Sequence, residues 1–539
     1  MKQLLFLILL VISSLLSAVE LDTLFILNTT DIHGNLFAYD YFKDEAAARG
    51  LVKIHTRINQ FRDEQKNVIL LDGGDMIQGT PLTYLYNHIY TDIPHPFISV
   101  MNLMGYDAMA VGNHEIEQGL NVCNRLRAES SFPWLAANSK LESGYSYFEP
   151  YKIIVKSGIR IAILGLTTPG IPKWIDSSYY EGIEWTDMLI TSREQMEYLK
   201  KNADVVIGLF HAGLEPSEKT TGLPQENAAG LVADQVPGFA VVFGGHTHKI
   251  SPVDTLTISD PNKPLKMIAG SHGNNLGIVK LVFEKRKDKT ILVNKTGWVE
   301  TVKDYPADSE IAEIYAEYHL STLEFIRKEV AVTETELTTT NAYFSDNPLI
   351  DLINTVQLHS GNAEISFASC FNPQLVIPEG PVKIKDIYTI YPYENFLFTI
   401  EMSGKEIKDY LEYSARFFQI QQGEISISQD IAGYNYDIAE GISYSIDLHY
   451  PEGSRIKDLK LSSSGEKIGE DQQYLVALNS FRALGGGGHL RAIGMNQPKI
   501  LYKSGQEIRN MIIEFLLENP DYKFQANNNW KIKEPKEEK

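Results

Sequence analysis

The chain has 539 residues, a hydrophobic content of 43% and a formal net charge of −20 at pH 7. This length allows large buried cores and exceeds one ordinary domain, so we expect two domains. The acidic balance argues against a polynucleotide partner, which would favour a basic groove. It leaves room for a small phosphorylated ligand, because bound cations can invert the local field.

The N-terminus has the layout of a secretory signal peptide. The first two residues precede an apolar stretch from Leu4 to Leu16 and then the small pair Ser17–Ala18. A membrane anchor is the alternative, but the stretch is shorter than the ~20 apolar residues needed to span a bilayer. We therefore expect cleavage after Ala18 and a periplasmic or secreted protein with no membrane span.

From residue 22 to residue 302, short apolar strands alternate with longer amphipathic stretches, which predicts an α/β layered domain. Ser309 to Glu329 carries apolar residues at helical spacing without Gly or Pro, and predicts one helix within a linker and hinge at residues 303–340. A second mixed α/β domain at residues 341–530 and a charged tail at residues 531–539 follow. We expect the hinge near residues 330–345 to let the two domains meet and separate.

The chain has only two cysteines, Cys123 and Cys370, and no C-x-x-C pair. Two buried free thiols are the expected state, although a disulfide between them stays open. Without paired thiolates, any transition metal would be held by His, Asp and Asn, and these ligands suit Zn, Mn or Fe.

Five apolar runs in the first domain each end in residues that can bind a metal. In chain order they are Leu24 to Asn28 with Asp31 and His33, Val68 to Leu71 with Asp75, Met109 to Val111 with Asn113 and His114, Val205 to Phe210 with His211, and Ala240 to Phe243 with His246 and His248. A single Asp or His at a strand end is usually a turn residue. The same chemistry after five strands predicts one metal crevice at their carboxyl ends.

The order D-x-H, G-D, G-N-H-E, H and G-H-x-H resembles the calcineurin-like metallophosphoesterases. The resemblance implies a two-sheet α/β sandwich holding two divalent metal ions, and a metal-activated water that attacks phosphorus. It implies that His114 faces the phosphate and either stabilises its developing charge or protonates the leaving group, with Glu117 orienting the ring. The implied ligands are Asp31, His33 and His248 for one metal, Asn113, His211 and His246 for the other, and Asp75 as the bridge.

The second domain adds a resemblance to the secreted 5'-nucleotidases, carried by Gly73 to Thr80, the Y-P-Y-E-N segment at Tyr391 and the N-S-F-R-A segment at Asn479. It implies that this domain binds the nucleotide substrate. Tyr393 and Phe481 would stack on the base, and Asn395 and Gly433 would lie close to the base and ribose. Two core aromatics are the alternative interpretation of that pair.

Three departures leave the ester open. Glu117 stands where the family has Asp, Ala368 to Pro373 replaces a G-G-I-R segment, and Asp351 lies where an arginine is expected. Losing arginine forks changes which ester is held over the metals. The pattern is close to the 2',3'-cyclic-nucleotide phosphodiesterase/3'-nucleotidase branch of the family. Both that branch and the 5'-nucleotidase branch are therefore kept as interpretations. A sulfur-ester hydrolase and a binding protein without turnover are weaker alternatives.

Overall fold

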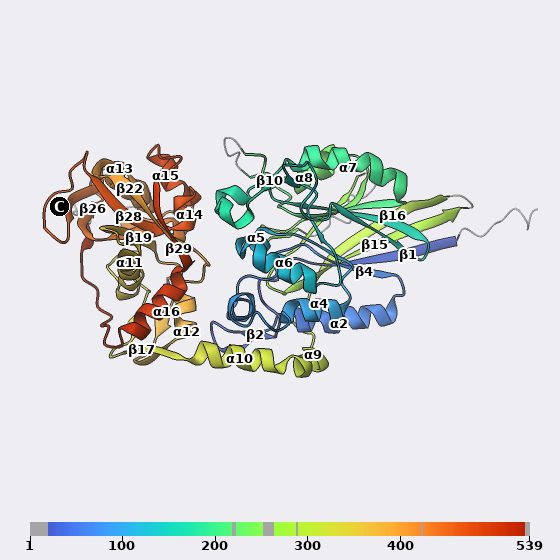
Figure 1. The fold of residues 1–539 in the computed structure, drawn as a ribbon, viewed down its shortest axis with the longest axis horizontal. Helices are drawn as coiled ribbons and strands as arrows, with labels where there is room; N and C mark the ends of the chain where they lie inside the picture. The colour runs from blue at the N-terminus through green and yellow to red at the C-terminus, as the bar shows by residue number, and fades with distance from the viewer. Residues whose placement is uncertain (1–19, 218–222, 252–262, 287–288, 422–423, 534–539) are drawn as a thin grey trace, which may run out of the picture.

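The computed structural model describes residues 20–217, 223–251, 263–286, 289–421 and 424–533. The expected signal peptide and residues 534–539 of the tail lie outside this range. Two domains lie side by side, the first built from β1 to β16 and the second from β17 to β30, and two consecutive helices run along one edge of both (Figure 1). The predicted two-domain α/β class is confirmed.

Two six-stranded sheets form the centre of the first domain. In spatial order, the first contains β16 (Lys289–Thr301), β15 (Asn275–Arg286), β1 (Glu20–Thr29), β4 (Val68–Asp72), β5 (Ala108–Ala110) and β6 (Trp134–Leu135). The second contains β13 (Ile250–Ser251), β14 (Leu265–Ala269), β12 (Phe239–Phe243), β11 (Val205–His211), β9 (Ile159–Thr167) and β8 (Tyr151–Lys156).

Four adjacent strands of each sheet are parallel, and this sets the position of the site. β1, β4, β5 and β6 run in one direction in the first sheet, as do β9, β11, β12 and β14 in the second. Their carboxyl ends therefore lie together at one edge of each sheet. Every residue of β4 and β11 is buried, because both faces of each sheet are covered.

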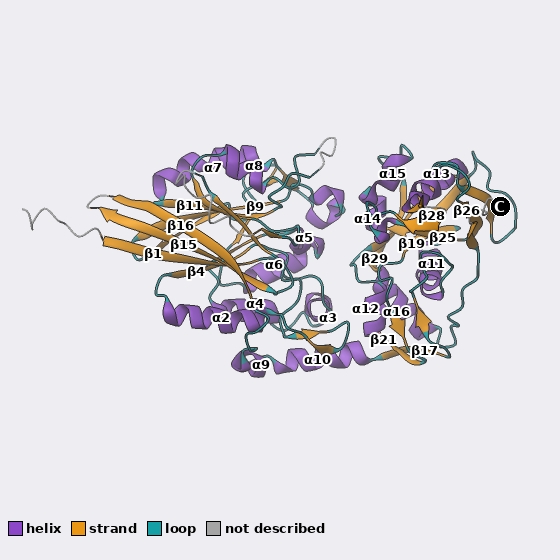
Figure 2. Cartoon of the chain, turned by 180° about the vertical axis from the view of Figure 1, so that it is seen from behind, coloured by secondary structure: helices purple, strands orange, loops and turns teal. Residues whose placement is uncertain are grey.

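Helices cover the outer faces of the sandwich (Figure 2). α2 (Leu51–Glu64), α4 (Pro96–Met104) and α6 (Gly119–Glu129) pack on the first sheet, and α7 (Met188–Asn202) and α8 (Ala229–Gln235) on the second. A third apolar cluster lies between the sheets and includes Ile26, Leu71, Ile163 and Ile207. The smaller elements are β2 (Tyr39–Asp40), β3 (Glu45–Ala46), α3 (Pro81–Tyr84), the π-helix η1 (Leu85–Ile89), α5 (Asn113–Glu117), β7 (Ser139–Leu141) and β10 (Ile183–Trp185).

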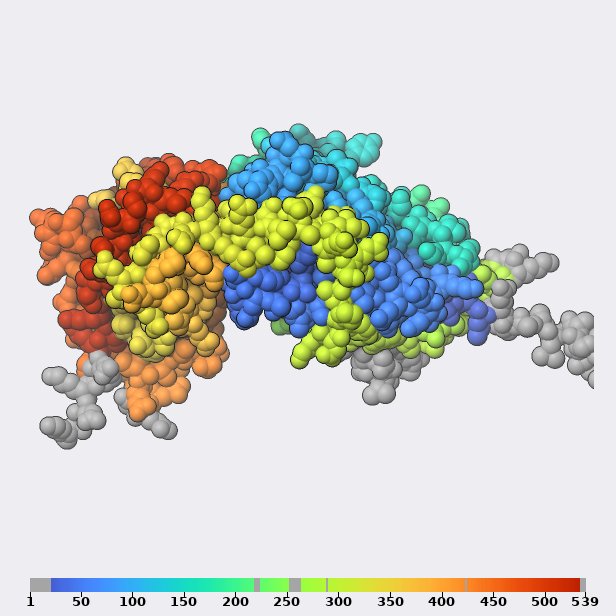
Figure 3. Space-filling model, turned by 90° about the horizontal axis from the view of Figure 1, so that it is seen from below, coloured from blue at the N-terminus to red at the C-terminus, as the bar shows by residue number. Residues whose placement is uncertain are grey.

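The predicted single linker helix is wrong in one respect. The chain forms α9 (Ser309–Ile314) and α10 (Ala316–Arg327), separated at Tyr315, where φ is −104° and ψ is 17°. The Tyr318 N–H donates to the Tyr315 carbonyl, so the helix restarts with a tightened turn. The sequence has no Gly or Pro there to signal the break. α10 runs along the surface across both domains (Figure 3).

The second domain is built on a mixed five-stranded sheet. In spatial order, its strands are β25 (Asp437–Glu440), β19 (Ile365–Ser369), β28 (Gln473–Asn479), β22 (Phe396–Ser403) and β29 (Ile500–Glu507). Its helices are α11 (Pro348–Gly361), α12 (Ile384–Ile390), α13 (Gly404–Ser414), α14 (Ser480–Ala483), α15 (His489–Ala492) and α16 (Ile508–Glu518). A side sheet contains β27 (Ile456–Leu461), β26 (Ile442–Asp447) and β30 (Trp530–Lys533). Short pairs join β17 (Glu329–Thr333) to β21 (Gly380–Lys383), β18 (Leu337–Thr338) to β20 (Val376–Ile377), and β23 (Phe418–Gln421) to β24 (Glu424–Ile427).

Three further expectations concern the whole chain. Cys123 and Cys370 are both buried and unpaired, as predicted. Across the described ranges, no helix is both long and apolar enough to cross a membrane. The hinge near residues 330–345 stays a prediction, and its first residues form β17, which pairs with β21 inside the second domain.

Candidate active site

The seven predicted metal ligands follow the carboxyl ends of five parallel strands. Asp31 and His33 come after β1, Asp75 after β4 and Asn113 after β5. In the other sheet, His211 ends β11, and His246 and His248 follow β12. Because the two sheets face each other, the structure brings residues up to 217 positions apart into one crevice.

The ligand atoms form two overlapping groups. Asp31, His33 and His248 make one, and Asp75, His211 and His246 make another, with the ligand atoms of each group within 4.8 Å of one another. Asp75 reaches both groups. Its Oδ2 lies 3.0 Å from Nε2 of His211 and 4.0 Å from Nε2 of His33.

The imidazoles are oriented as metal ligands are. Nδ1 of His211 lies 2.7 Å from the carbonyl oxygen of Gly73, and Nδ1 of His33 lies 3.3 Å from that of Gln78. A carbonyl only accepts, so each Nδ1 carries a proton, and Nε2 is the ring atom of each that is placed to bind a metal. Burial disfavours the charged ring, but Asp75 raises the pKa of His211 to about 9, so metal binding there requires release of its Nε2 proton. Nε2 of His33 faces Nε2 of His248 at 2.8 Å.

The protonation states of two of the predicted ligands also fit metal binding. Burial lowers the pKa of His33 well below its ordinary value, and burial together with His272 lowers the pKa of His248 to about 4, so both rings are neutral near pH 7. Burial opposes ionisation of Asp75, but His211 and His114 hold its pKa well below the usual range. Neutral imidazoles beside a carboxylate are the donors that divalent transition metals bind, so these residues fit such ions.

The backbone at the ligands is unusual. Left-handed φ values, which non-glycine residues rarely adopt, occur at five predicted ligands: Asp31 (52°), His33 (47°), Asp75 (59°), His246 (70°) and His248 (58°). Such conformations persist only where the surroundings impose them, and they gather at functional sites. Each turn directs a ligand back over the strand end.

Glu115 and Gly112 hold the Asp75 loop in place. The buried Glu115 carboxylate accepts hydrogen bonds of 2.8 Å from the backbone N–H groups of Asp75, Met76 and Gly112. A Cβ on Gly112 would lie only 2.1 Å from Oδ1 of Asp75, so this position requires glycine. Each residue of the G-N-H-E motif thus has a separate role. Gly112 lets the Asp75 loop come close, Asn113 is a predicted ligand, His114 is the predicted catalytic histidine, and Glu115 supports the loop that carries Asp75.

His114 lies at the boundary between the metal ligands and the open pocket. Its Nδ1 is 2.5 Å from Oε2 of Glu117, and its backbone N–H donates to Oδ1 of Asp75 at 2.9 Å. Burial disfavours the charged ring, but the Asp75 and Glu117 carboxylates raise the pKa of His114 to about 10. The longer arm of Glu117, compared with the Asp of the family, therefore still reaches the ring.

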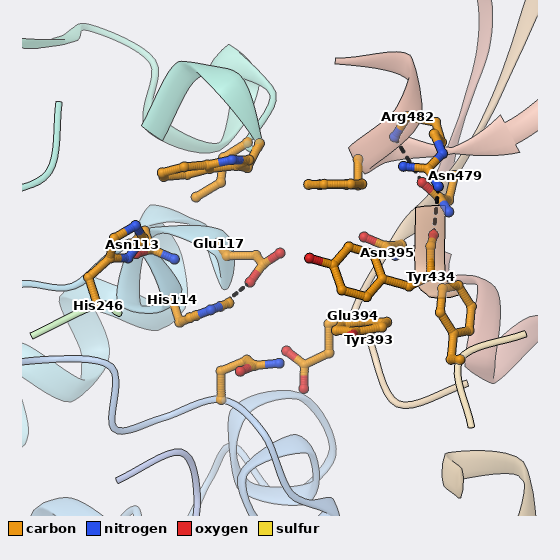
Figure 4. Close-up of a pocket in the computed structure, with 15 residues that line it drawn as sticks. Asn113, His114, Glu117, His246, Tyr393, Glu394, Asn395, Tyr434, Asn479 and Arg482 are labelled. Carbon is orange, nitrogen blue, oxygen red and sulfur yellow. Dashed lines mark hydrogen bonds and ion pairs between the residues drawn. The ribbon is translucent and has the colours of Figure 1, made fainter. Parts of the chain in front are cut away.

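A cavity of about 380 Å³ lies between the two domains. His114, Glu117 and two of the predicted ligands, Asn113 and His246, face it from the first domain (Figure 4). Tyr393, Asn395 and Asn479 face it from the second. Phe481 also lines it. Both predicted catalytic residues and both predicted stacking aromatics therefore share one cavity.

The predicted base-binding residues divide into three that line the cavity and one that does not. Tyr393 is 43% exposed, with Phe371 packed edge-on against it at a centroid distance of 5.1 Å. Asn395 and Phe481 line the cavity as expected. Gly433 does not, because the ring of Tyr343 packs over it, and its neighbour Tyr434 takes that place.

Several residues that contact the site belong to no recognisable sequence motif. Trp174 packs against the ring of His246 with centroids 5.3 Å apart, and Oε1 of Glu226 lies 3.3 Å from Nε2 of His246. Arg482 lines the cavity but is held by Asp437, with bonds of 2.8 and 2.9 Å. Trp174 and Glu226 come from loops without periodicity, so only their position in the fold reveals them.

Comparison with known proteins places this site in a family. Residues 26–250 match the calcineurin-like phosphoesterase domain, and residues 328–494 match the 5'-nucleotidase C-terminal domain. The chain belongs to the family that joins these two domains. It is accordingly a metal-dependent phosphoric ester hydrolase.

Relatives match most of the chain. The trifunctional nucleotide phosphoesterase protein YfkN of Bacillus subtilis is 30% identical over 94% of this chain, which spans 38% of that relative's length. A 2',3'-cyclic-nucleotide 2'-phosphodiesterase/3'-nucleotidase of Salmonella typhimurium is 27% identical, with 94% of this chain and 88% of that protein covered.

Among solved structures, a candidate 5'-nucleotidase from Staphylococcus aureus has the same fold, with a TM-score of 0.80 over 95% of this chain and all of that one at 21% identity.

Proposed function

We propose that the chain hydrolyses phosphoesters of nucleotides, with the base held by the second domain and the phosphorus at the metal ligands of the first. The observation that carries this proposal is the cavity of about 380 Å³ that His114 and Glu117 share with Tyr393 and Phe481. A nucleotide needs both parts, because its base and its phosphate bind by stacking and by charge respectively.

When bound, two divalent ions, which we propose to be Zn, Mn or Fe, would supply an activated water and would polarise the phosphoryl oxygens. The seven side chains that follow the strand ends would hold them, with Asp75 between the two groups. Glu115 keeps the Asp75 loop rigid through three backbone N–H groups. The chain's own contribution is therefore to hold the metal-binding side chains in position before the metals and substrate bind.

We assign the proton transfer to His114. Glu117 holds the Nδ1 proton, and the raised pKa keeps a second proton on Nε2. That proton can be donated to the leaving oxygen as the P–O bond breaks, or can stabilise the charge that develops on the phosphoryl group. Tyr393 and Phe481 would fix the nucleoside so that its ester oxygen lies within reach.

The ester that is cleaved depends on the cations near the ribose. Arg482 is the only arginine on the described lining of the cavity, and its guanidinium already bonds to Asp437, Asn435 and two backbone carbonyls. No arginine fork is left there to grip a 5'-phosphate or ribose hydroxyls. The lack of a free arginine is the reason to keep 2',3'-cyclic and 3'-nucleotides as a second class of candidate substrates, beside 5'-nucleotides.

The test is phosphate release from 5'-AMP, 3'-AMP and 2',3'-cyclic AMP by protein reloaded with Mn or Zn, with a coupled phosphatase for the cyclic ester. A preference for 5'-AMP would support the 5'-nucleotidase activity. A preference for the other two would assign the chain to the cyclic-phosphodiesterase branch. Full metal occupancy without turnover of any of the three would contradict the proposal and direct attention to sulfur esters.

We also propose that the enzyme acts in the periplasm or outside the cell, on the basis of the first 18 residues alone. Cell fractionation of the full-length chain tests this. A cytoplasmic pool with an intact N-terminus would contradict it.

A further inference from the structure

A cluster of three carboxylates lies in the second domain and is absent from the lining of the cavity described above. Asp346 precedes α11, Asp351 lies in its first turn, and Glu440 ends β25. One oxygen of each lies within 4.8 Å of one oxygen of each of the others. Asp351 is 4% exposed and Glu440 6% exposed, so this is a buried cluster rather than a solvated acidic surface.

Each carboxylate has one satisfied oxygen and one unsatisfied oxygen. Backbone N–H groups of Asn527 and Asn528 donate to Asp351 and Asp346, and the side-chain amide of Asn527 donates to Glu440 at 2.9 Å. The other oxygens, Oδ1 of Asp346, Oδ1 of Asp351 and Oε1 of Glu440, are buried and accept no hydrogen bond from an N–H or hydroxyl group, and Asp351 contacts Asp346 and Glu440 only carboxyl to carboxyl. Buried polar atoms are rarely left this way, and three in one cluster require an explanation.

No ion pair offsets the cluster either, in the part of the chain that the structure describes. Among the residues that the structure describes, no lysine, arginine or histidine forms an ion pair with any of the three carboxylates. Buried carboxylates are normally paired with a cation or coordinate a metal. Burial and the neighbouring carboxylates raise the pKa of Asp351 to about 8, and burial raises that of Glu440 to about 7.

A buried hydroxyl within reach of the charge of Asp346 also lacks a hydrogen-bond partner. The hydroxyl of Tyr436 has no partner although the residue is only 1% exposed, and its pKa is raised by burial and, in part, by the charge of Asp346. The indole nitrogen of Trp530, directly after the asparagines, is likewise unsatisfied. Polar groups around an ion and its water ligands would have partners that the protein alone does not supply.

We propose that Asp346, Asp351 and Glu440 bind a divalent cation of the calcium class. The donors are all oxygen, with no imidazole or thiolate, which suits a hard cation rather than Zn. Three charges with flexible mono- or bidentate geometry match Ca²⁺ better than Mg²⁺, which demands strict octahedral geometry. The ion would fasten the C-terminal segment at Asn527 and Asn528 to α11 and β25, and would be separate from the metals of the active site.

The experiment uses the full chain with its active site loaded with Mn, freed of Ca²⁺ and then titrated with CaCl₂ by calorimetry and thermal unfolding. We expect one additional site, and at a Ca²⁺ concentration 100 times Kd the folded-to-unfolded ratio should rise about 100-fold, seen as a higher Tm. Glu440→Gln should lose the binding heat and the Tm rise. Asp409→Asn, which changes an exposed carboxylate of α13, should keep both.

Two results of this titration would overturn the proposal. The first is no heat and no Tm rise in the wild-type chain, which would mean that shared protons neutralise the cluster. The second is an unchanged response in Glu440→Gln. Because that variant could fail to fold, Tb³⁺ offers a measurement on the unmodified protein: Trp530 should sensitise its luminescence, and Ca²⁺ should quench it by displacement. Luminescence that Mn²⁺ removes and Ca²⁺ does not would place the lanthanide in the active site and also contradict the proposal.

Discussion

Gln118 and Glu394 join the two domains through a buried hydrogen bond of 2.9 Å, from Nε2 of the glutamine to Oε2 of the glutamate. Gln118 directly follows α5, which carries His114 and Glu117. Glu394 lies between Tyr393 and Asn395 in the base pocket, and Nη2 of Arg509 lies 3.4 Å from its other carboxylate oxygen. This buried contact therefore helps to align the two halves of the cavity, and it exists only when the domains meet.

Removing this contact should weaken nucleotide turnover selectively. In Gln118→Ala we expect kcat/KM for the preferred nucleotide to fall about 10- to 100-fold, because a hydrogen bond to a charged group contributes about 1.5–3 kcal/mol and the buried Oε2 of Glu394 loses its donor. Steady-state kinetics measure it. A small aryl phosphate, which has no base for the second domain to hold, should be hydrolysed as before.

Lys503→Ala is the matched control, since Lys503 pairs with Asp176 across the same interface but is exposed. Exposed ion pairs contribute little, so its effect should stay within a few-fold. Equal losses on nucleotide and aryl phosphate in Gln118→Ala would show instead that α5 had been disturbed.

Asp75→Asn tests the metal assignment. The amide cannot neutralise two nearby dications, so metal affinity should fall by more than the ~10–100-fold typical of outer-shell changes, and activity should fall to background. Metal analysis by mass spectrometry and phosphate release check both. Asp22→Asn, near the start of the neighbouring strand β1 and paired with Lys285, should change neither. Full metal content with full activity in Asp75→Asn would remove Asp75 from the site.

His114→Ala should separate proton transfer from metal binding. We expect kcat to fall by the ~10²–10⁴-fold typical of a lost general acid, with metal content unchanged. Glu117→Gln should lower kcat by a smaller factor and leave KM unchanged, because it removes the charge beside Nδ1 but keeps an acceptor. A loss of metal in His114→Ala would reassign the residue as a ligand.

Tyr393→Ala should raise KM for nucleotides by about 5- to 150-fold, since stacking contributes about 1–3 kcal/mol per base. The same variant should hydrolyse small aryl phosphates normally. Tyr343→Phe, which keeps a ring beside Gly433 outside the cavity lining, is the control and should bind nucleotides as the wild type does. Unchanged KM in Tyr393→Ala would make Tyr393 a structural aromatic only.

The Asp437–Arg482 pair gives a pH prediction for stability. Burial opposes ionisation of Asp437, but the bidentate contact with Arg482 holds its pKa well below the usual range. Because the folded-state pKa is depressed, this stabilisation is fully present above the unfolded pKa of about 3.9 and is lost as pH falls toward the folded value. Asp437→Asn should therefore lower the free energy of unfolding by about 3–5 kcal/mol at pH 7, since it leaves a buried guanidinium uncompensated.

Denaturant titrations across pH measure this difference, which should stay constant down to about pH 5 and shrink below about pH 4. Asp458→Asn, whose partner Lys533 is exposed, should show no such dependence. A pH-independent difference between Asp437→Asn and the wild type would mean that packing, not charge, sets its effect.

Patterns local in the chain were sufficient to predict the two domains, the parallel strands of the first domain and the positions of the predicted ligands, because each depends on a few neighbouring residues. An apolar run that ends in Gly and His is visible without its partners. The same holds for Y-P-Y-E-N, although the sequence does not show that Glu394 of that motif bonds to Gln118, 276 residues away.

Only the tertiary structure decided the features that depend on packing between distant segments. The left-handed turns at Asp31 and His248, the helix break at Tyr315 and the replacement of Gly433 by Tyr434 at the cavity have no local signal, because neighbouring segments impose those conformations. The carboxylate cluster is a further case. Asp351 stood out in the sequence as a missing arginine, and the fold shows that it lies beside Glu440 and two asparagines from the last strand connection. Charge and burial act through space, so the sequence by itself determines which groups are present, and the packed chain determines which of them meet.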